Sequence, residues 1–143
     1  MAVSFQVTFD CADPDAQARF WAAALDYILQ PPPAGYADWE SFLTEQGMAH
    51  LMGQASAIVD PAGTGPRIFF QRVPEQKTVK NRVHLDLNVS DARRAGPEEG
   101  KRRRDETVQR LIGLGASVVR AFEEHGETWT IMRDPEGNEF CVQ

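Results

Sequence analysis

Residues 83–91 read Val-His-Leu-Asp-Leu-Asn-Val-Ser-Asp, and residues 5–14 read Phe-Gln-Val-Thr-Phe-Asp-Cys-Ala-Asp-Pro. In both stretches apolar and polar residues alternate, which is the period of a half-buried β-strand. Each strand ends at an aspartate and leads toward a helical stretch. The same strand-to-helix pattern therefore occurs twice in the chain.

A second pair of matching stretches follows the first. Asp-Pro-Ala-Gly at residues 60–63 answers Asp-Pro-Glu-Gly at residues 134–137, and each turn leads into a short apolar strand, at 68–73 and at 139–142. Asp, Pro and Gly are typical turn residues. Two copies of strand, helix and strands predict a single α+β domain built from two modules related by an internal two-fold.

The modules are predicted at about residues 4–73 and 82–143, with the polar stretch 74–81 as linker, and together they form one domain, 1–143. Residues 5–73 and 83–142 are expected to superpose. Asp13 is a typical N-cap and Pro14 a typical first helical residue. Residues 37–47 favour a short helix over a strand. Further strands are predicted at 55–60 and 67–73, and in the second module at 82–89, 117–122, 128–133 and 138–142.

The polar stretch 92–104 reads as irregular, with a helix beginning near Arg102 and closed by Gly115 after its C-cap. Its basic residues, 93–94 and 101–104, are interrupted by Glu98 and Glu99. We interpret them as a solvated face, with an anion or partner site as the alternative.

Charge and composition exclude some classes of protein. The net charge is −6, which argues against nucleic-acid binding because that rests on phosphate neutralisation by Lys and Arg. Two cysteines without a CxxC motif are typical of a reducing compartment. No apolar run approaches the roughly 20 residues of a membrane span. These features predict a cytoplasmic protein that does not enter a membrane.

Two longer stretches, together with the strand that opens the second module, resemble a known family. Gly-Pro-Arg-Ile-Phe-Phe-Gln-Arg-Val-Pro-Glu at 65–75 is followed by Lys-Thr-Val-Lys-Asn-Arg-Val-His-Leu-Asp-Leu at 77–87, and Asp-Pro-Glu-Gly-Asn-Glu-Phe-Cys-Val closes the chain at 134–142. The sequence resembles the vicinal oxygen chelate superfamily, which includes glyoxalase I, bleomycin-resistance proteins and extradiol dioxygenases. The resemblance implies two βαβββ modules whose curled mixed sheets surround a cleft for a small molecule.

Metal-using members of that superfamily take four ligands from equivalent strands. The resemblance places these positions at Gln6 and His84 in the first strands, and at Phe69 and Cys141 in the last strands; Phe70 or Gln71 replaces Phe69 if the turn is counted differently. Phenylalanine cannot bind a metal, and glutamine is a poor ligand. We therefore expect no tightly bound metal cofactor. If a divalent metal binds, its ligands are His84, Gln6 and Cys141.

His84 has three readings. It is a histidine held by a hydrogen bond in the cleft or core, an acid–base or substrate-binding group, or a metal ligand. Strand alternation puts Asp86 on the same face, where it is expected to orient the imidazole, so these two are the candidate catalytic residues. Gln6, Thr8 and Asp86 would then face the cleft.

The opposite face of these strands should pack on helices, and its residues in the second module are Val83, Leu85 and Leu87. For Cys141, in an apolar strand, we expect a small buried hydrophobe.

Aromatic residues supply candidate pocket walls. Trp39 and Trp129 are read equally as pocket or core residues, whereas Trp21 is expected in the core. His50 and His125 lie in turn-like contexts and are expected to be exposed. The predicted ligand-binding residues are Gln6, Thr8, Trp39, Phe69, His84 and Cys141.

The function predicted from these observations is the binding of a small molecule, including sequestration of the drug-resistance kind, with a degraded metal site. Two alternatives stay open: a metal-dependent lyase, isomerase or dioxygenase, and a metal-free enzyme that uses His84 for acid–base chemistry. The resemblance also implies a homodimer, since family members often pair.

Overall fold

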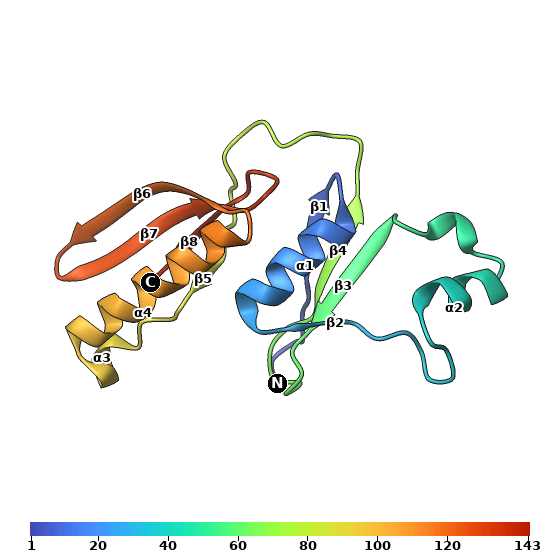
Figure 1. Ribbon diagram of the computed structural model, residues 1–143, viewed down its shortest axis with the longest axis horizontal. Helices are drawn as coiled ribbons and strands as arrows, with labels where there is room; N and C mark the ends of the chain where they lie inside the picture. The colour runs from blue at the N-terminus through green and yellow to red at the C-terminus, as the bar shows by residue number, and fades with distance from the viewer. The chain divides into compact units, whose positions relative to one another are not determined.

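The computed structural model describes residues 1–143. The chain divides into two compact units, Met1–Gln76 and Lys77–Gln143, and each is described by itself (Figure 1). The boundary falls within the polar stretch 74–81. None of the helices combines the length and the hydropathy that a membrane span requires.

The first unit is a four-stranded mixed sheet with one long helix on it. Its sheet order is β1-β4-β3-β2; β1 runs parallel to β4, and the other neighbours are antiparallel. The elements in chain order are β1 (Val7–Cys11), α1 (Pro14–Leu25), β2 (Ile28–Leu29), α2 (Trp39–Glu45), the 3₁₀-helix η1 (Ala49–Leu51), β3 (Ala55–Val59) and β4 (Ile68–Arg72).

The second unit repeats this topology. Its sheet order is β5-β8-β7-β6, with β5 parallel to β8 and the other neighbours antiparallel. The predicted α+β fold of two tandem βαβββ modules is therefore confirmed. The elements are β5 (Asp86–Leu87), α3 (Ala92–Ala95), α4 (Pro97–Gly113), β6 (Ser117–Glu124), β7 (Glu127–Arg133) and β8 (Glu139–Val142).

The two cores differ in their side chains. In the first unit α1 covers the sheet, and Trp21 and Phe70 are fully buried there, with Phe9 bridging them at ring-centroid distances of 5.2 and 5.3 Å. Burial of Trp21 confirms its prediction as a core residue. In the second unit α4 packs on the sheet, and its core is mostly aliphatic. The buried side chains there include Leu87, Val108, Leu111, Met132, Phe140 and Val142.

Helix ends follow the predicted capping residues. The Asp13 carboxylate accepts the Ala16 N–H at 3.1 Å and begins α1, with Pro14 as the first helical residue. At the end of α4, Gly115 has a φ of +109° and donates its N–H to Ile112, while Ala116 donates to Leu111. These two bonds satisfy carbonyls left open at the helix end, which confirms Gly115 as the terminating residue.

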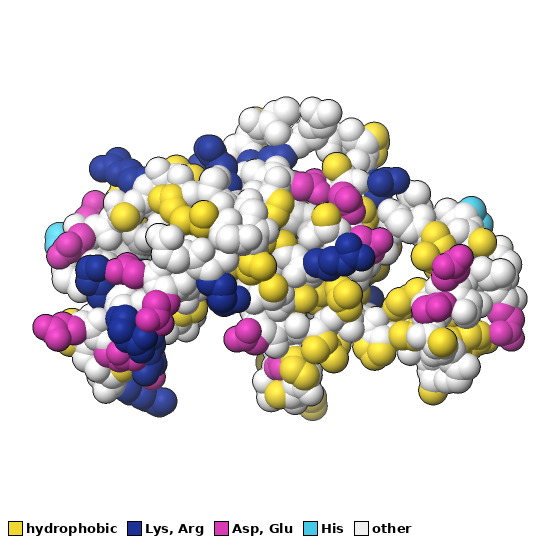
Figure 2. Space-filling view, in the orientation of Figure 1, with side chains coloured by type: hydrophobic (Ala, Val, Ile, Leu, Met, Phe, Trp, Pro, Cys, Tyr) yellow, Lys and Arg dark blue, Asp and Glu magenta, His cyan; other side chains and the backbone are white.

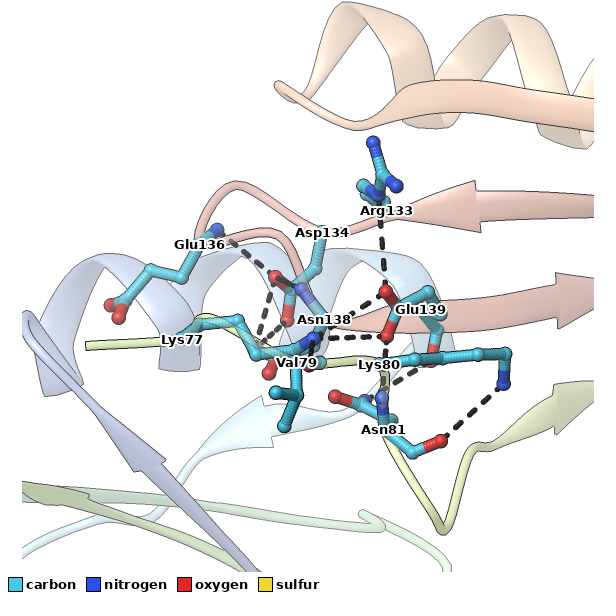
Figure 3. Close-up of polar contacts among 9 residues, drawn as sticks. All are labelled: Lys77, Val79, Lys80, Asn81, Arg133, Asp134, Glu136, Asn138 and Glu139. Atoms are coloured by element: carbon cyan, nitrogen blue, oxygen red, sulfur yellow. Dashed lines mark hydrogen bonds and ion pairs between the residues drawn. The ribbon is translucent and has the colours of Figure 1, made fainter. Parts of the chain in front are cut away.

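The paired Asp-Pro-x-Gly turns have the same geometry in both units. Asp60 accepts the Ala62 N–H with its side chain and the Gly63 N–H with its backbone carbonyl. Asp134 makes the same pair of bonds to Glu136 and Gly137, and Figure 3 shows its side-chain bonds to Glu136 and Asn138. Both glycines have positive φ, at +71° and +89°, a conformation that glycine adopts without strain.

Glu139 ties the start of the second unit to β8 (Figure 3). Its carboxylate accepts the Asn81 N–H at 2.9 Å and lies 3.2 Å from the Lys77 ammonium. Burial opposes ionisation, but the hydrogen bond from Asn81 and the Lys77 charge hold the pKa of Glu139 at about 2. The later half of the predicted linker is therefore part of the second unit.

Two predicted elements differ from the structure. The strand expected at 82–89 is reduced to Asp86–Leu87, and its backbone bonds to β8 begin only at the Leu85 carbonyl. Residues 82–84 have no strand beside them, so Val83 does not pack on a helix and is 83% exposed. A two-residue strand at 28–29 was not predicted.

The stretch predicted as irregular up to residue 104 is helical from Ala92, with α4 beginning at Pro97. Glu99 pairs with Arg102 and Arg103 at 2.7 and 2.8 Å, and Lys101 and Arg102 pair with acidic residues one turn on, Asp105 and Glu106. Such pairs three and four residues apart stabilise a polar helix surface. Figure 2 shows basic and acidic side chains interleaved over this helix.

Candidate functional site

The first unit contains a cavity of about 300 Å³ between the α2–η1 segment and the sheet. Small-molecule sites are concave, mostly apolar and of this order of volume or larger. Most of the lining is apolar, with one guanidinium. The lining residues are Asp15, Leu29, Gln30, Trp39, Leu43, Leu51, Met52, Gly53, Ala55, Ser56, Ala57, Arg67 and Phe69.

Arg67 and Asp15 are the two charged groups on the cavity wall, and Arg67 is the one fixed by contacts with its neighbours. Its Nε donates to Gln30 Oε1 at 2.7 Å and its Nη1 donates to Gln6 Oε1 at 2.9 Å. The guanidinium carbon lies 5.2 Å from the centre of the Phe69 ring, within the range of a cation–π contact. These contacts hold the guanidinium in one place, where it can receive a hydrogen-bond acceptor.

Trp39, on α2, also lines the cavity. Its indole Nε1 donates to the Gln30 carbonyl at 2.9 Å, and its side chain packs edge-on against Phe42. No residue of α2 is buried, and the helix extends to the side beyond β3 (Figure 1). Figure 2 shows hydrophobic side chains gathered on this part of the surface. The cavity is therefore open and apolar.

In the second unit the structure groups His84, Asp86 and Cys141. The imidazole Nε2 lies 3.4 Å from Asp86 Oδ1, and the candidate ligand atoms of all three residues lie within 4.8 Å of one another. His84 and Asp86 are exposed, whereas Cys141 is 9% exposed. Burial of Cys141 agrees with the reading of a small buried hydrophobe.

The Cys141 side chain is a thiol at neutral pH. Burial raises the pKa of the thiol to about 11, and the Asp86 carboxylate adds to the shift by its charge and by accepting the S–H. Nucleophilic attack requires the thiolate. Cys141 is therefore not an activated nucleophile in this arrangement.

The strand registers relate these residues to the first unit. Thr8 stands opposite Phe69, and Asp86 stands opposite Cys141. Side chains on one face of a strand recur every second residue. Gln6 and His84 lie two residues before Thr8 and Asp86, so they hold matching positions in the two units. Phe69 and Cys141 therefore hold matching places beside the first strand of each unit, and the alternatives Phe70 and Gln71 do not.

The donor set of metal-using members does not fit this chain. Phe69 offers no donor atom, and Gln6 Oε1 already accepts a hydrogen bond from Arg67. The Arg67 guanidinium adds a positive charge beside that position, which repels a divalent cation. Only the second unit offers strong donors, and one of them is a thiol with a pKa of about 11. We therefore derive no chemical step through a metal.

The predicted ligand-binding residues fall into two groups. Trp39 and Phe69 line the same cavity, and Gln6 touches it through Arg67; Thr8 pairs with Phe69 across the sheet. His84 and Cys141 lie together in the second unit. One cleft that all of them share stays a prediction.

Trp129 stacks on Phe122 at 5.2 Å and lines a separate hollow of the second unit. His50 and His125 are exposed, as expected.

Arg67 was not singled out from the sequence. It is two residues before Phe69, so strand alternation carries its side chain to the same face. That alternation is the signal that identifies it.

A scan against protein-family models matches residues 6–143 to the glyoxalase-like domain. The chain belongs to this family. This family match confirms the predicted resemblance to the vicinal oxygen chelate superfamily. Comparison with curated proteins found no match.

Several solved structures share the fold. A hypothetical protein of Staphylococcus aureus has a TM-score of 0.64 at 15% identity, over 99% of this chain and 93% of that one. A fosfomycin resistance protein of Listeria monocytogenes, complexed with Mn(II) and a dihydroxypropylphosphonic acid, scores 0.63 at 10% identity over 100% and 90%. A glyoxalase/bleomycin resistance/dioxygenase family enzyme of Burkholderia phytofirmans scores 0.61 at 16% identity over 96% and 94%. At these identities the likeness shows the fold alone.

Proposed function

We propose that this glyoxalase-like protein binds a small organic molecule in the cavity of its first unit, without a metal, and acts by sequestering it. The observation that carries the proposal is the placement of Arg67 on the wall of an otherwise largely apolar cavity. An apolar lining with a small number of fixed polar groups is the usual composition of a small-molecule site. Gln6 and Gln30 hold the guanidinium from two sides.

The cavity also defines the ligand's chemistry. Trp39, Leu43 and Phe69 favour an apolar or aromatic body. The guanidinium favours a group that accepts hydrogen bonds, and a negatively charged one most of all. The ligand is therefore a compact, partly apolar molecule with one acceptor group directed at Arg67.

A thermal-shift screen tests the proposal. The panel contains small metabolites and antibiotics, fosfomycin and bleomycin among them because structural neighbours carry these names, and each compound is measured with EDTA and with added Zn, Mn or Fe. We expect at least one compound to raise the melting temperature equally in both conditions. The hit should bind Arg67→Met more weakly by about 1–3 kcal/mol, the scale of a hydrogen bond to a charged group. A panel in which every hit requires metal would contradict the proposal.

Matched variants locate the site. Phe69→Ala and Trp39→Ala should weaken binding of the same hit, whereas Trp129→Ala, in the other unit, should not. His84→Ala tests the wider site predicted from the sequence: if the ligand also reaches the second unit, this variant weakens binding by about 1–3 kcal/mol while the fold survives. Unchanged affinity in both Phe69→Ala and Arg67→Met would place the ligand elsewhere.

A second function rests on the His84–Asp86 pair. The 3.4 Å separation between His84 Nε2 and Asp86 Oδ1 is longer than a strong hydrogen bond, yet it leaves the imidazole beside a carboxylate. Such a pair can move a proton in a metal-free reaction, and with Cys141 it can also offer donors to a metal. Elemental analysis of protein purified without chelator separates these readings. We expect well under one equivalent of Zn, Fe, Mn or Ni per chain; one full equivalent, lost in His84→Ala, would favour a metal enzyme.

We also propose a cytoplasmic homodimer. The edge strand β2 exposes Ile28 and Leu29, each to 47%, and β6 exposes Val118 and Val119. Unpaired sheet edges with apolar side chains are surfaces that association covers. Light scattering should give a mass near twice the 16.0 kDa of the chain. A monomer mass throughout the micromolar range would contradict the dimer.

A further inference from the structure

Arg104 is a buried arginine without a partner. It is 7% exposed and lies on the buried stripe of α4 with Gly100, Val108 and Leu111. Its neighbours Arg102 and Arg103 both pair with Glu99, but Arg104 makes no hydrogen bond or ion pair. The sequence reading of the whole basic run as a solvated face is therefore wrong for this residue.

A mostly buried arginine without a partner is unusual, and its nitrogens keep some contact with solvent, because Gln17 Oε1 is the one fully buried side-chain polar atom that lacks a partner. Buried charges in proteins are almost always paired or hydrogen-bonded, because removing a charge from water without compensation costs several kcal/mol. A buried polar group that lacks a partner calls for an explanation. For Arg104 the explanation lies in the space that its side chain borders.

That space is a hollow of about 570 Å³ in the second unit, near the start of α4. It is large enough for a small organic ligand. The start of α4 at Pro97 has no side-chain cap, and Glu98 and Glu99 in its first turn offset the positive end of the helix dipole, so Arg104 rather than the helix end is the group available to an anion. The lining residues that decide the ligand's chemistry are Arg93, Arg104, Trp129, Asp91 and Glu127.

We propose that this hollow binds a small aromatic carboxylate, with the Arg104 guanidinium as the partner of the carboxylate. A guanidinium matches a carboxylate with two parallel hydrogen bonds. Trp129 offers an apolar wall, held by its stacking on Phe122, and flat rings pack well against such a wall. Ser90 and Thr128 add hydroxyl groups at the rim.

The acidic residues of the hollow limit the charge of the ligand. Asp91 and Glu127 offset the charges of Arg93 and Arg104. A dianionic phosphate would meet more repulsion from these carboxylates than a singly charged carboxylate meets. The site therefore favours a monoanion. It lies wholly within the second unit, so this inference does not rest on the function proposed for the first unit.

NMR titration of the ¹⁵N-labelled full chain tests the proposal. The probes are 2-naphthoate, its uncharged isostere 2-naphthamide, and inorganic phosphate. We expect 2-naphthoate at millimolar concentrations to shift the amides of Ser90 and Thr128 and the indole of Trp129. Naphthamide and phosphate should shift them much less. Absence of these shifts, or equal shifts with naphthamide or phosphate, would overturn the proposal.

Matched variants identify the guanidinium. Arg104→Met keeps an unbranched apolar stem and removes the guanidinium, and should weaken 2-naphthoate binding roughly tenfold or more. Arg94→Met, an exposed residue of α3 outside the hollow, removes the same charge and should change nothing. Equal affinity in Arg104→Met and the parent would overturn the proposal.

The melting temperature without ligand gives an independent readout. Because Arg104 has no partner in the free protein, Arg104→Met should melt at the same or a higher temperature than the parent. A melting temperature several degrees lower would show that Arg104 has a structural partner in solution, and would also overturn the proposal.

Discussion

In the first unit the sheet position two residues before Phe69 holds Arg67, whereas in the second unit the matching position, two residues before Cys141, holds Glu139. The backbone around both is alike. Arg67 donates hydrogen bonds to Gln30, which lines the cavity, and to Gln6. Glu139 instead accepts the Asn81 N–H and pairs with Lys77, both at the start of its own unit. The same sheet topology therefore carries a positive side chain beside a cavity in one unit and, at the matching position, a negative side chain that binds the start of the chain in the other.

The neighbouring positions differ in the same way. Gln6, Thr8 and Phe69 in the first unit stand where His84, Asp86 and Cys141 stand in the second. The first set surrounds an arginine beside an apolar cavity, and the second set is a titratable cluster. Duplication therefore kept the fold and let the chemistry of the two sheets diverge, which is why fold and function need separate arguments.

The largest effect we expect separates the two cores. Phe70→Ala should cost about 3–5 kcal/mol of unfolding free energy, because a fully buried aromatic ring leaves a large cavity. Val142→Ala, the matching core position of β8, should cost only about 2 kcal/mol, since two methyl groups are lost instead of a whole ring. Urea denaturation measures both. Val83→Ala, at an exposed site, is the control. Equal losses of unfolding free energy in the two core variants would contradict the expected difference between the aromatic and the aliphatic core.

The next effect tests the role of Glu139. Glu139→Gln should cost about 1–2 kcal/mol at neutral pH, because the amide loses the charge that Lys77 and the Asn81 N–H favour. The pKa of Glu139 is lowered to about 2 in the fold. Its stabilisation is therefore present above the ordinary glutamate pKa and lost as the pH falls toward 2. The unfolding free energies of the parent and of Glu139→Gln should converge as the pH falls toward 2. A difference that persists in acid would show that the shape of the side chain, and not its charge, stabilises the unit.

A smaller effect sharpens the contrast between Phe69 and Cys141. With a thiol pKa of about 11, roughly one Cys141 side chain in a thousand is ionised at pH 8, so alkylation by iodoacetamide should be slow. Asp86→Asn removes the negative charge that helps to raise this pKa, and should speed alkylation. Mass spectrometry follows the rate, with Cys11 as an internal control. An unchanged rate would mean that burial alone sets the reactivity.

The smallest effect concerns a segment that only the first unit has. Between β2 and β3 it carries α2 and η1, whereas β6 and β7 are joined by the turn at His125 and Gly126. Trp39→Phe removes the indole hydrogen bond to Gln30. It should change global stability by about 1 kcal/mol or less, but speed hydrogen exchange of the α2 amides, because no α2 residue is buried. Unchanged exchange would show that other contacts hold α2.

Sequence patterns predicted the repeat because its signals are local. Asp13, Gly115 and the two Asp-Pro-x-Gly turns act through bonds to residues a few positions away. The resemblance suggested Phe69 as the partner of Cys141 but left Phe70 and Gln71 open, and the strand registers decided for Phe69, because the turns before the two strands differ in length. The long helix α4 was placed too late, since its polar first half is stabilised by ion pairs rather than by an apolar stripe.

The sequence by itself determined the tandem α+β fold, its turns, its capping residues and the face on which His84 and Asp86 lie together, because each depends on short-range spacing. Only the tertiary structure decided that Arg67 lies on a cavity wall and that Arg104 is buried without a partner. Arg67 precedes an apolar strand and Arg104 lies in a basic run, and sequence alone does not distinguish a guanidinium open to water from one enclosed by the fold. Burial depends on which distant elements pack around a side chain, and that packing sets the cost of its charge.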